Sequence, residues 1–199
     1  MARFAPAFVE GLLARFEKDM AICLTPAKAL RGSRPTHAYF PALAACCGFI
    51  EYLTGLHRGN LKRIGWQQVA AWAAVFMSQP DYDRETIRIL FDAFRNTVAH
   101  QGIASGVWVD PNRGVGEGRR ITWRLTADAR YPGCDVVPEV RELTRDPPWP
   151  CSYTHRVHIH LKRLSIDIRE AARRYRDRVA RDPDLQASFL ACMRQLYPE

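Results

Sequence analysis

Apolar residues recur at helical spacing along the first half of the chain. The clearest stripe lies between residues 84 and 101, where its members follow one another at i, i+3, i+4, i+7 and i+11: Ile87, Leu90, Phe91, Phe94 and Val98. Three earlier segments have the same period and are separated by short breaks that contain Pro or Gly. The pattern predicts four helices, at residues 6–24, 37–57, 64–78 and 84–101, packed as an antiparallel bundle.

The pattern changes between residues 105 and 160. Ile121, Trp123 and Leu125 alternate with polar residues, which is the period of a half-buried strand. A glycine-rich turn precedes this segment, so we expect a β-hairpin with residues 106–110. Residues 152–161 alternate again and predict a third strand, whereas residues 127–150 are rich in Pro and Asp and are expected to be mainly loop.

Helical spacing returns after this insertion and predicts two further helices, at residues 161–181 and 185–197. No internal repeat or domain boundary is apparent. We therefore predict a single domain over residues 1–199 of the mainly α (α+β) class. It is an antiparallel helical bundle with a small antiparallel β-sheet inserted at about residues 105–160.

Charge adds one constraint on function. The chain has 29 Lys and Arg against 21 Asp and Glu, a net charge of +8, and most of the cations are arginines. Such a surface is compatible with nucleic acid, phosphate or an anionic surface, because the guanidinium fork matches phosphate geometry. Charge alone selects none of these partners.

Cysteine usage and hydropathy indicate the compartment. None of the six cysteines forms a C-x-x-C pair, which is typical of small buried residues in a reducing compartment. We expect neither a metal site nor a cofactor. The most apolar stretch, residues 38–56, contains Pro41, Gly48 and Glu51 and suits a buried bundle helix better than a membrane span. With no apparent signal peptide, the sequence predicts a cytoplasmic protein with no membrane association.

The helix predicted at residues 84–101 also has a polar arc. At about 100° per residue, one side of this helix carries Arg88, Asp92, Arg95, Asn96 and His100. A helix needs only its apolar arc in order to pack. The polar arc is therefore the first place to look for chemistry.

Arg95, Asn96 and His100 form the pattern R-N-x-x-x-H late in a helical bundle. This pattern resembles the motif of the HEPN family, the higher eukaryote and prokaryote nucleotide-binding domain. The resemblance covers the motif and the four helices up to it, about half of the chain. It implies an all-α bundle that dimerises so that two motifs face each other and, in many members, metal-independent cleavage of RNA. By this resemblance Arg95 and His100 are the catalytic pair, and Asn96 is a supporting polar residue.

The residue types suit that chemistry independently. Cleavage of RNA by its own 2′-hydroxyl needs proton transfer, for which histidine is suited near neutral pH, and an arginine can stabilise the extra charge on the phosphorane. Arg95 and His100 lie about 140° apart on one ideal helix, too far to hold one phosphate together. A homodimer would bring two copies of each residue into one groove.

Two other interpretations of this helix stay open. In the first, the same fold is a non-catalytic module that binds a nucleotide, nucleic acid or a protein partner. In the second, the residues are structural: His100 complements the helix dipole, and Arg95 pairs with Asp92 or Asp81. The catalytic interpretation predicts an endoribonuclease, of the kind found in toxin or defence systems, for which an antitoxin-type protein is a candidate partner.

Two further groups are candidates for binding. Arg88 on the motif helix, with Arg173, Arg174 and Arg176 near the end of the chain, is predicted to contact nucleic acid. The alternative for the last three is a solvated helix face with i,i+4 pairs such as Glu170 with Arg174. His158 and His160 share a strand face with Arg156 and so could bind one metal ion. No third ligand has a suitable spacing, so we expect this strand face to be solvated.

Overall fold

The computed structural model describes residues 1–26, 37–77, 81–96, 106–111, 118–143 and 149–198. Helices occur in each segment where the sequence predicts one. They are α1 (Phe4–Leu24), α2 (Tyr39–Arg58), α3 (Trp66–Phe76), α4 (Arg84–Ile89), α6 (Leu161–Val179) and α7 (Pro183–Leu196). The strands are β1 (Trp108–Val109), β2 (Arg120–Thr126), β3 (Cys134–Leu143) and β4 (Cys151–His160). The predicted fold class, mainly α with a small sheet, is confirmed.

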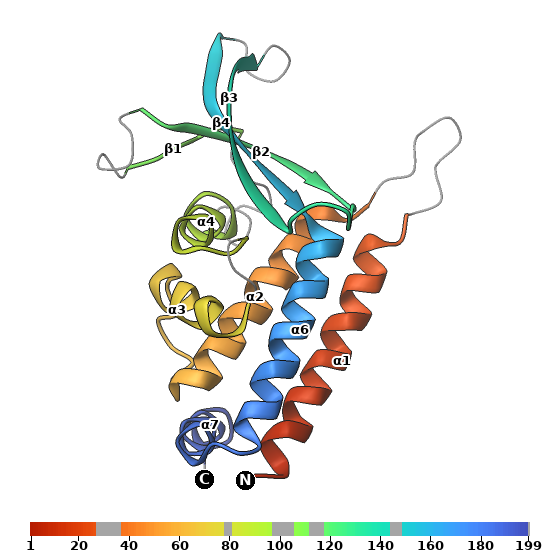
Figure 1. The fold of residues 1–199 in the computed structure, drawn as a ribbon, viewed down its shortest axis with the longest axis vertical. Coiled ribbons are helices and arrows are strands. Elements are labelled where there is room, and N and C mark those ends of the chain that lie inside the picture. The colour runs from red at the N-terminus through yellow and green to blue at the C-terminus, as the bar shows by residue number, and fades with distance from the viewer. Residues whose placement is uncertain (27–36, 78–80, 97–105, 112–117, 144–148, 199) are drawn as a thin grey trace.

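Three long helices, α1, α2 and α6, run side by side, and the sheet lies at one end of them (Figure 1). The apolar stripe of α1 supplies Val9, Leu13 and Phe16 to the core, and all three are buried. α3 and α7 pack against α2, while α4 lies between α3 and the sheet (Figure 1). This arrangement follows from the periodicity, because each helix buries the stripe that its sequence carries.

Local signals set several helix ends. The Asp83 carboxylate accepts a hydrogen bond from the backbone N–H of Thr86 at 2.7 Å and so caps α4. Asp182 caps α7 in the same way. α2 ends at Gly59, whose φ of 76° lies in the left-handed region that glycine adopts without strain.

α2 has the length and apolar composition of a membrane span. About half of its most apolar window is buried inside the structure, and a core helix of a soluble protein passes the same test of length and composition. Length and composition are therefore the only features of α2 that resemble a membrane span.

The strand order in the sheet is β1-β2-β4-β3. β1 pairs antiparallel with β2, and β3 pairs antiparallel with β4, but β2 and β4 run parallel, with Ile121 opposite His155. The sheet is therefore mixed, and the expectation of a wholly antiparallel sheet was wrong. The reason is that β3 precedes β4 in the chain and lies on its far side, so that β2 and β4 point the same way.

β3 lies in the segment that the sequence predicts to be loop, and that prediction was wrong. Pro138 obscured the strand signal, although proline is tolerated in an edge strand or at a bulge. β3 occupies an edge of the sheet, and its pairing with β4 is irregular between Pro138 and Arg141. Both conditions under which a strand accepts proline are met here.

One face of the sheet, the inner face, packs against the helices. Ile121, Val157 and Ile159 are fully buried there. The rings of Trp123 in β2 and Phe40 in α2 meet edge to face, with centroids 5.4 Å apart. Because side chains alternate along a strand, Arg124, Arg156 and His158 belong to the opposite face, which we call the outer face.

Candidate functional site

The motif helix changes character just before Arg95. After α4, residues Leu90–Arg95 form a π-helical turn. Such turns are rare and are frequent at functional sites. A π turn bonds residue i to i+5, so residues after it are rotated relative to the α-helical wheel that the sequence predicts. Arg88 and Arg95 accordingly have different surroundings and no common site.

Arg95 is held by Glu51 of α2. Its Nε and Nη2 atoms donate to the Glu51 Oε2 atom at 3.0 and 2.8 Å, and Nη2 lies 2.7 Å from Oε1. The Arg95 side chain keeps 29% of its exposure and the Glu51 side chain 16%. The predicted structural alternative, pairing with Asp92 or Asp81, was wrong, because the partner comes from a different helix.

Asn96 lies next to this pair and supports it. The Arg95 Nη1 atom donates to the Asn96 side-chain oxygen at 3.0 Å. Asn96, the predicted supporting residue, is therefore in direct contact with Arg95. His100, the other predicted catalytic residue, lies outside the described residues.

Arg95 opens onto a surface depression of about 350 Å³. The depression is lined by Gly48, Glu51 and Tyr52 of α2 together with Leu61, Arg63 and Ile64 of the following turn. Two cations, a carboxylate and a phenol thus meet at one surface hollow. This set can bind an anionic group, provided that the anion reaches the arginine edge that Glu51 leaves uncovered.

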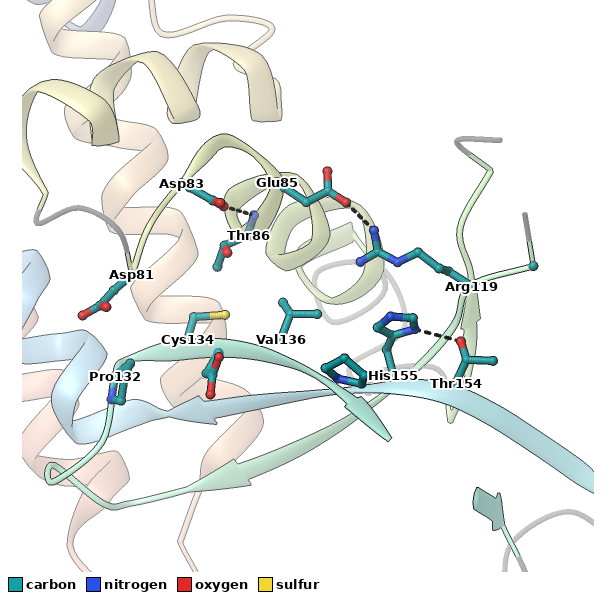
Figure 2. A pocket seen from close by; sticks show the side chains of 13 residues that line it. Asp81, Asp83, Glu85, Thr86, Arg119, Pro132, Cys134, Val136, Thr154 and His155 are labelled. Atoms are coloured by element: carbon teal, nitrogen blue, oxygen red, sulfur yellow. Dashed lines mark hydrogen bonds and ion pairs between the residues drawn. The ribbon is translucent and has the colours of Figure 1, made fainter. Parts of the chain in front are cut away.

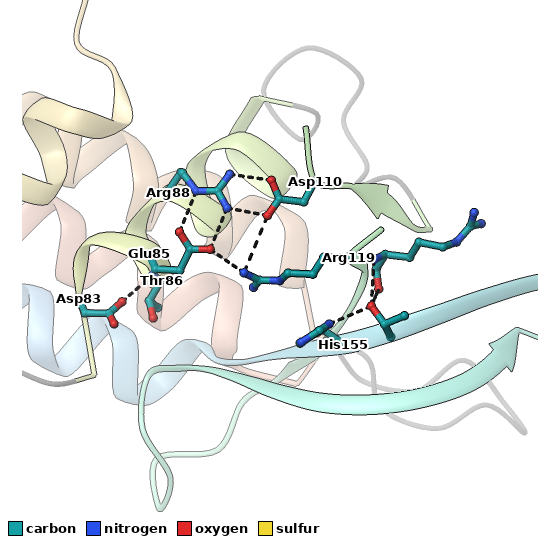
Figure 3. Close-up of polar contacts among 9 residues, drawn as sticks. Asp83, Glu85, Thr86, Arg88, Asp110, Arg119 and His155 are labelled. Atoms are coloured by element: carbon teal, nitrogen blue, oxygen red, sulfur yellow. Dashed lines mark hydrogen bonds and ion pairs between the residues drawn. The ribbon is translucent and has the colours of Figure 1, made fainter. Parts of the chain in front are cut away.

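Arg88 lies in a different setting, and its predicted contact with nucleic acid was wrong. Its Nη1 and Nη2 atoms donate to the two carboxylate oxygens of Asp110 at 2.9 and 2.6 Å, and its Nε atom donates to Glu85 at 2.9 Å (Figure 3). The Arg88 side chain is only 6% exposed, and that of Asp110 is fully buried. This arginine joins α4 to the segment after β1 and has no surface to offer a phosphate.

Arg119 joins Arg88, Glu85 and Asp110 in one group of charged side chains, the Arg88 network, and extends it toward the sheet. Its Nη1 atom lies 2.8 Å from Glu85, which therefore bridges two arginines (Figure 3). Hydrogen bonds from Arg88, opposed by partial burial, lower the pKa of the Glu85 carboxyl. The network fixes the start of α4 against the sheet.

A cleft of about 760 Å³ opens beside this network, between the start of α4 and strands β3 and β4 (Figure 2). Its wall carries the carboxylates of Asp81, Asp83 and Glu85. The His155 Nδ1 atom lies 2.9 Å from the Thr154 hydroxyl, and burial, with a smaller effect of Arg119, lowers the His155 pKa. The site thus offers a neutral imidazole that can accept a proton.

Sequence reasoning missed this cleft. Asp81, Asp83 and Glu85 lie 70 or more positions before His155 in the chain, so no local pattern joins them. The closely spaced carboxylates at 81, 83 and 85 were the one available signal. The Cys134 thiol also lines the cleft, but burial raises its pKa, so it stays protonated and is a poor nucleophile.

The three C-terminal arginines predicted to bind nucleic acid all have carboxylate neighbours. Arg173 and Arg176 reach across to α1, where they contact Glu17 at 3.3 Å and Glu10 at 2.6 Å. Arg174 pairs with Glu170, as the structural alternative expects, and also donates to the carbonyl oxygen of Phe76. These contacts offset much of the charge, so their role in nucleic-acid binding stays a prediction.

His158 and His160 lie side by side on β4, with ring centroids 6.2 Å apart. The His160 Nδ1 atom is engaged with the Thr126 hydroxyl at 2.8 Å. In the described part of the chain, no group of three or more His, Cys, Asp or Glu residues is placed to hold a metal ion.

Comparison with known proteins found no match: no family model, no curated protein and no solved structure matches the chain.

Proposed function

We propose that this protein is an HEPN-like endoribonuclease that cleaves RNA without a metal ion and acts as a homodimer. Arg95 binds the scissile phosphate, Asn96 helps to hold Arg95, and His100 transfers protons. The proposal rests on the R-N-x-x-x-H motif and on the way in which Arg95 is held. A toxin or defence component, restrained by an antitoxin-type partner, is the biological role that this chemistry suits.

The geometry of Arg95 is the observation that carries the proposal. A guanidinium has five N–H groups. In the described residues, Glu51 engages one on Nε and one on Nη2, and Asn96 engages one on Nη1. The N–H groups that these printed hydrogen bonds leave over belong to the terminal nitrogens, and the Arg95 side chain lines the depression. A fixed guanidinium with N–H groups to spare is what a phosphate contact needs.

The reaction needs no other reactant. The 2′-oxygen of the ribose loses its proton and bonds to phosphorus, and the bond from phosphorus to the 5′-oxygen breaks. That oxygen takes up a proton, so the products are a 2′,3′-cyclic phosphate and a 5′-hydroxyl. One histidine accepts the first proton and another donates the second, which is why two copies of His100 in a dimer suit the mechanism.

Cleavage of labelled RNA in EDTA tests the proposal. We expect the wild-type chain to produce cyclic phosphate ends, and Arg95→Ala to lower the rate by about 10²–10³-fold, the usual cost of removing one donor to a developing oxyanion. Arg194→Ala removes an exposed arginine from α7 and is the matched control. Equal cleavage by wild type and Arg95→Ala would contradict the proposal.

Glu51 is a positioning residue in this scheme, and its variants sharpen the test. Glu51→Ala leaves Arg95 unrestrained and is expected to slow cleavage. Glu51→Gln keeps an oxygen that accepts a hydrogen bond from the guanidinium and should restore part of the rate. A purely structural role predicts instead that both variants change the melting temperature and leave the cleavage rate per folded molecule unchanged.

A non-catalytic binding module is the second candidate. An anion at Arg95 must compete with the Glu51 carboxylate already in place, which disfavours strong stabilisation of a transition state more than it disfavours weak, reversible binding. In this case the chain binds a nucleotide, RNA or a protein partner at the depression without turnover. RNA binding that Arg95→Ala weakens, with no cleavage by wild type, would select this candidate.

A further inference from the structure

We propose that the outer face of the sheet binds single-stranded RNA by stacking bases on a row of side-chain rings. This face lies at the sheet end of the molecule, whereas Arg95 pairs with Glu51 along α2 (Figure 1). The proposed surface is therefore separate from the motif. It does not depend on cleavage at Arg95.

The rings form a continuous series. Tyr131 lies against His160, with centroids 5.2 Å apart and planes inclined by 34°, and His160 is followed by His158 at 6.2 Å and 19°. The Arg130 guanidinium lies over the Tyr131 ring, 5.8 Å from its centroid, so a base that stacks on this ring displaces the guanidinium. The series ends toward Arg156, two residues before His158 on the same strand face.

The members of this series have different roles. Tyr131 is 54% exposed and His158 is half-buried, so their rings are accessible to bases. His160 is buried beneath Tyr131 and bonded to Thr126, so it supports the tyrosine and does not itself touch a base. A ring fixed from behind loses little freedom when a base stacks on it, which favours binding.

The surroundings of the two histidine rings favour their neutral form. Burial lowers the pKa of both histidines, and the neighbouring cations Arg156 and Arg124 lower that of His158 further. Asp135, opposite His158 on β3, and Glu139 act in the other direction with smaller effect. The two imidazoles are therefore mainly neutral at pH 7 and present aromatic faces.

Cations beside the rings suit a phosphate backbone. Arg124 lies opposite His158 on the neighbouring strand, is exposed, and has no ion pair with any described residue. Arg156, by contrast, is paired with Glu139. An exposed arginine next to aromatic rings is the combination found on surfaces that bind single strands, where stacking is tolerant of sequence.

A structural role explains less of this face. A solvated strand face needs only polar residues, and ring-to-ring contacts are not required for that purpose. A metal site is also a poor match, because His160 already uses its Nδ1 atom and the described residues supply no third ligand. Bound single-stranded RNA accounts both for the rings and for an exposed Arg124 that forms no ion pair within the described part of the chain.

Fluorescence anisotropy with a labelled 2′-O-methyl oligouridine tests the proposal. This probe cannot be cleaved through its 2′-oxygen, so binding is measured whether or not the motif is catalytic. We expect Tyr131→Ala and Arg124→Ala each to raise Kd about fivefold or more, since stacking on one ring has an effect of at least this size. Tyr131→Phe keeps the ring and should bind as wild type does.

Matched controls come from α7 and the residue that follows it, at the opposite end of the molecule (Figure 1). Tyr197→Ala removes a tyrosine that is 66% exposed, and Arg194→Ala removes an exposed arginine. Both are expected to leave Kd unchanged. Arg95→Ala should bind this probe nearly as well as wild type, which separates failure of the sheet surface from failure of the motif.

Three outcomes would overturn the proposal. The first is a Kd that responds equally to the variants of the sheet and of α7. The second is a duplex of the same length that binds as tightly as the single strand, because only phosphates would then be recognised. The third is a dimer, seen by light scattering, that dissociates in Tyr131→Ala, since a second copy would then cover this face. Circular dichroism melting of every variant identifies any loss of fold.

Discussion

Arg88 and Arg95 lie seven residues apart on one helical segment, and they have opposite surroundings. Arg88 is buried between Glu85 and Asp110, makes four hydrogen bonds to these carboxylates and is only 5% exposed. Arg95 has one carboxylate partner, Glu51, and an edge that opens to a surface depression. The comparison teaches that an arginine is a candidate for phosphate binding only when its partners leave N–H groups exposed.

The largest expected effect is on stability at Arg88. Arg88→Met removes the bidentate donor of the fully buried Asp110 carboxylate and keeps only the more distant Arg119, at 3.9 Å, among its described cations, and removal of one partner of a buried pair costs about 3–5 kcal/mol. Urea unfolding measures this as a lower midpoint with an unchanged slope. Arg84→Met, which removes an exposed arginine from the same helix, is the control and should change the midpoint little.

Arg95→Ala is expected to have a smaller effect on folding, about 1 kcal/mol or less, because its ion pair is partly exposed. A double-mutant cycle sharpens the difference. The coupling between Arg88 and Asp110 should exceed that between Arg95 and Glu51, since only the first pair is fully desolvated. Equal coupling energies would show that the two ion pairs do not differ in desolvation.

The Arg88 network should also give stability a dependence on pH. The Glu85 pKa is lowered on folding, so its contribution is complete above the pKa of the unfolded chain and is lost as the pH falls through the lower folded value. Glu85→Gln should reduce the fall in urea midpoint between neutral pH and acid. A midpoint that changes with pH equally in both proteins would contradict this assignment.

The smallest expected effect concerns His155 in the cleft. Folding lowers its pKa, so protonation favours the unfolded chain, and the contribution is complete above the unfolded pKa of about 6.5 and declines below it. NMR titration of the ring protons should give a midpoint below 6.5. Arg119→Gln should move the midpoint only part of the way back, because burial has the larger effect.

The helices could be predicted because their signal is local. An apolar stripe repeats every three or four residues within one segment, and Asp83 caps α4 from three residues away. Arg88 and Arg95 could not be distinguished in this way. Asp110 and Glu51, the partners that separate them, are 22 and 44 residues distant, and a helical wheel contains neither.

The sheet shows the same limit in another form. β2 and the core of β4 were predicted from alternation, but β3 was not, because Pro138 is acceptable only where a strand is at an edge or bulges. Whether a strand lies at an edge or contains a bulge is decided by the tertiary structure of the sheet, which the local sequence does not show. The cleft beside His155 was missed for the same reason, since it needs β3 and β4 to meet the start of α4.

The parallel pairing of β2 with β4 has a consequence for the order of assembly. Each antiparallel pair, β1 with β2 and β3 with β4, joins strands that are near each other in the chain. The parallel ladder instead pairs Ile121 with His155, and the chain between them contains all of β3. Contacts across a longer loop carry a larger entropic cost of closure and form more slowly. We therefore expect two local units to form first, and the sheet that supports both the outer face and the cleft to be completed last.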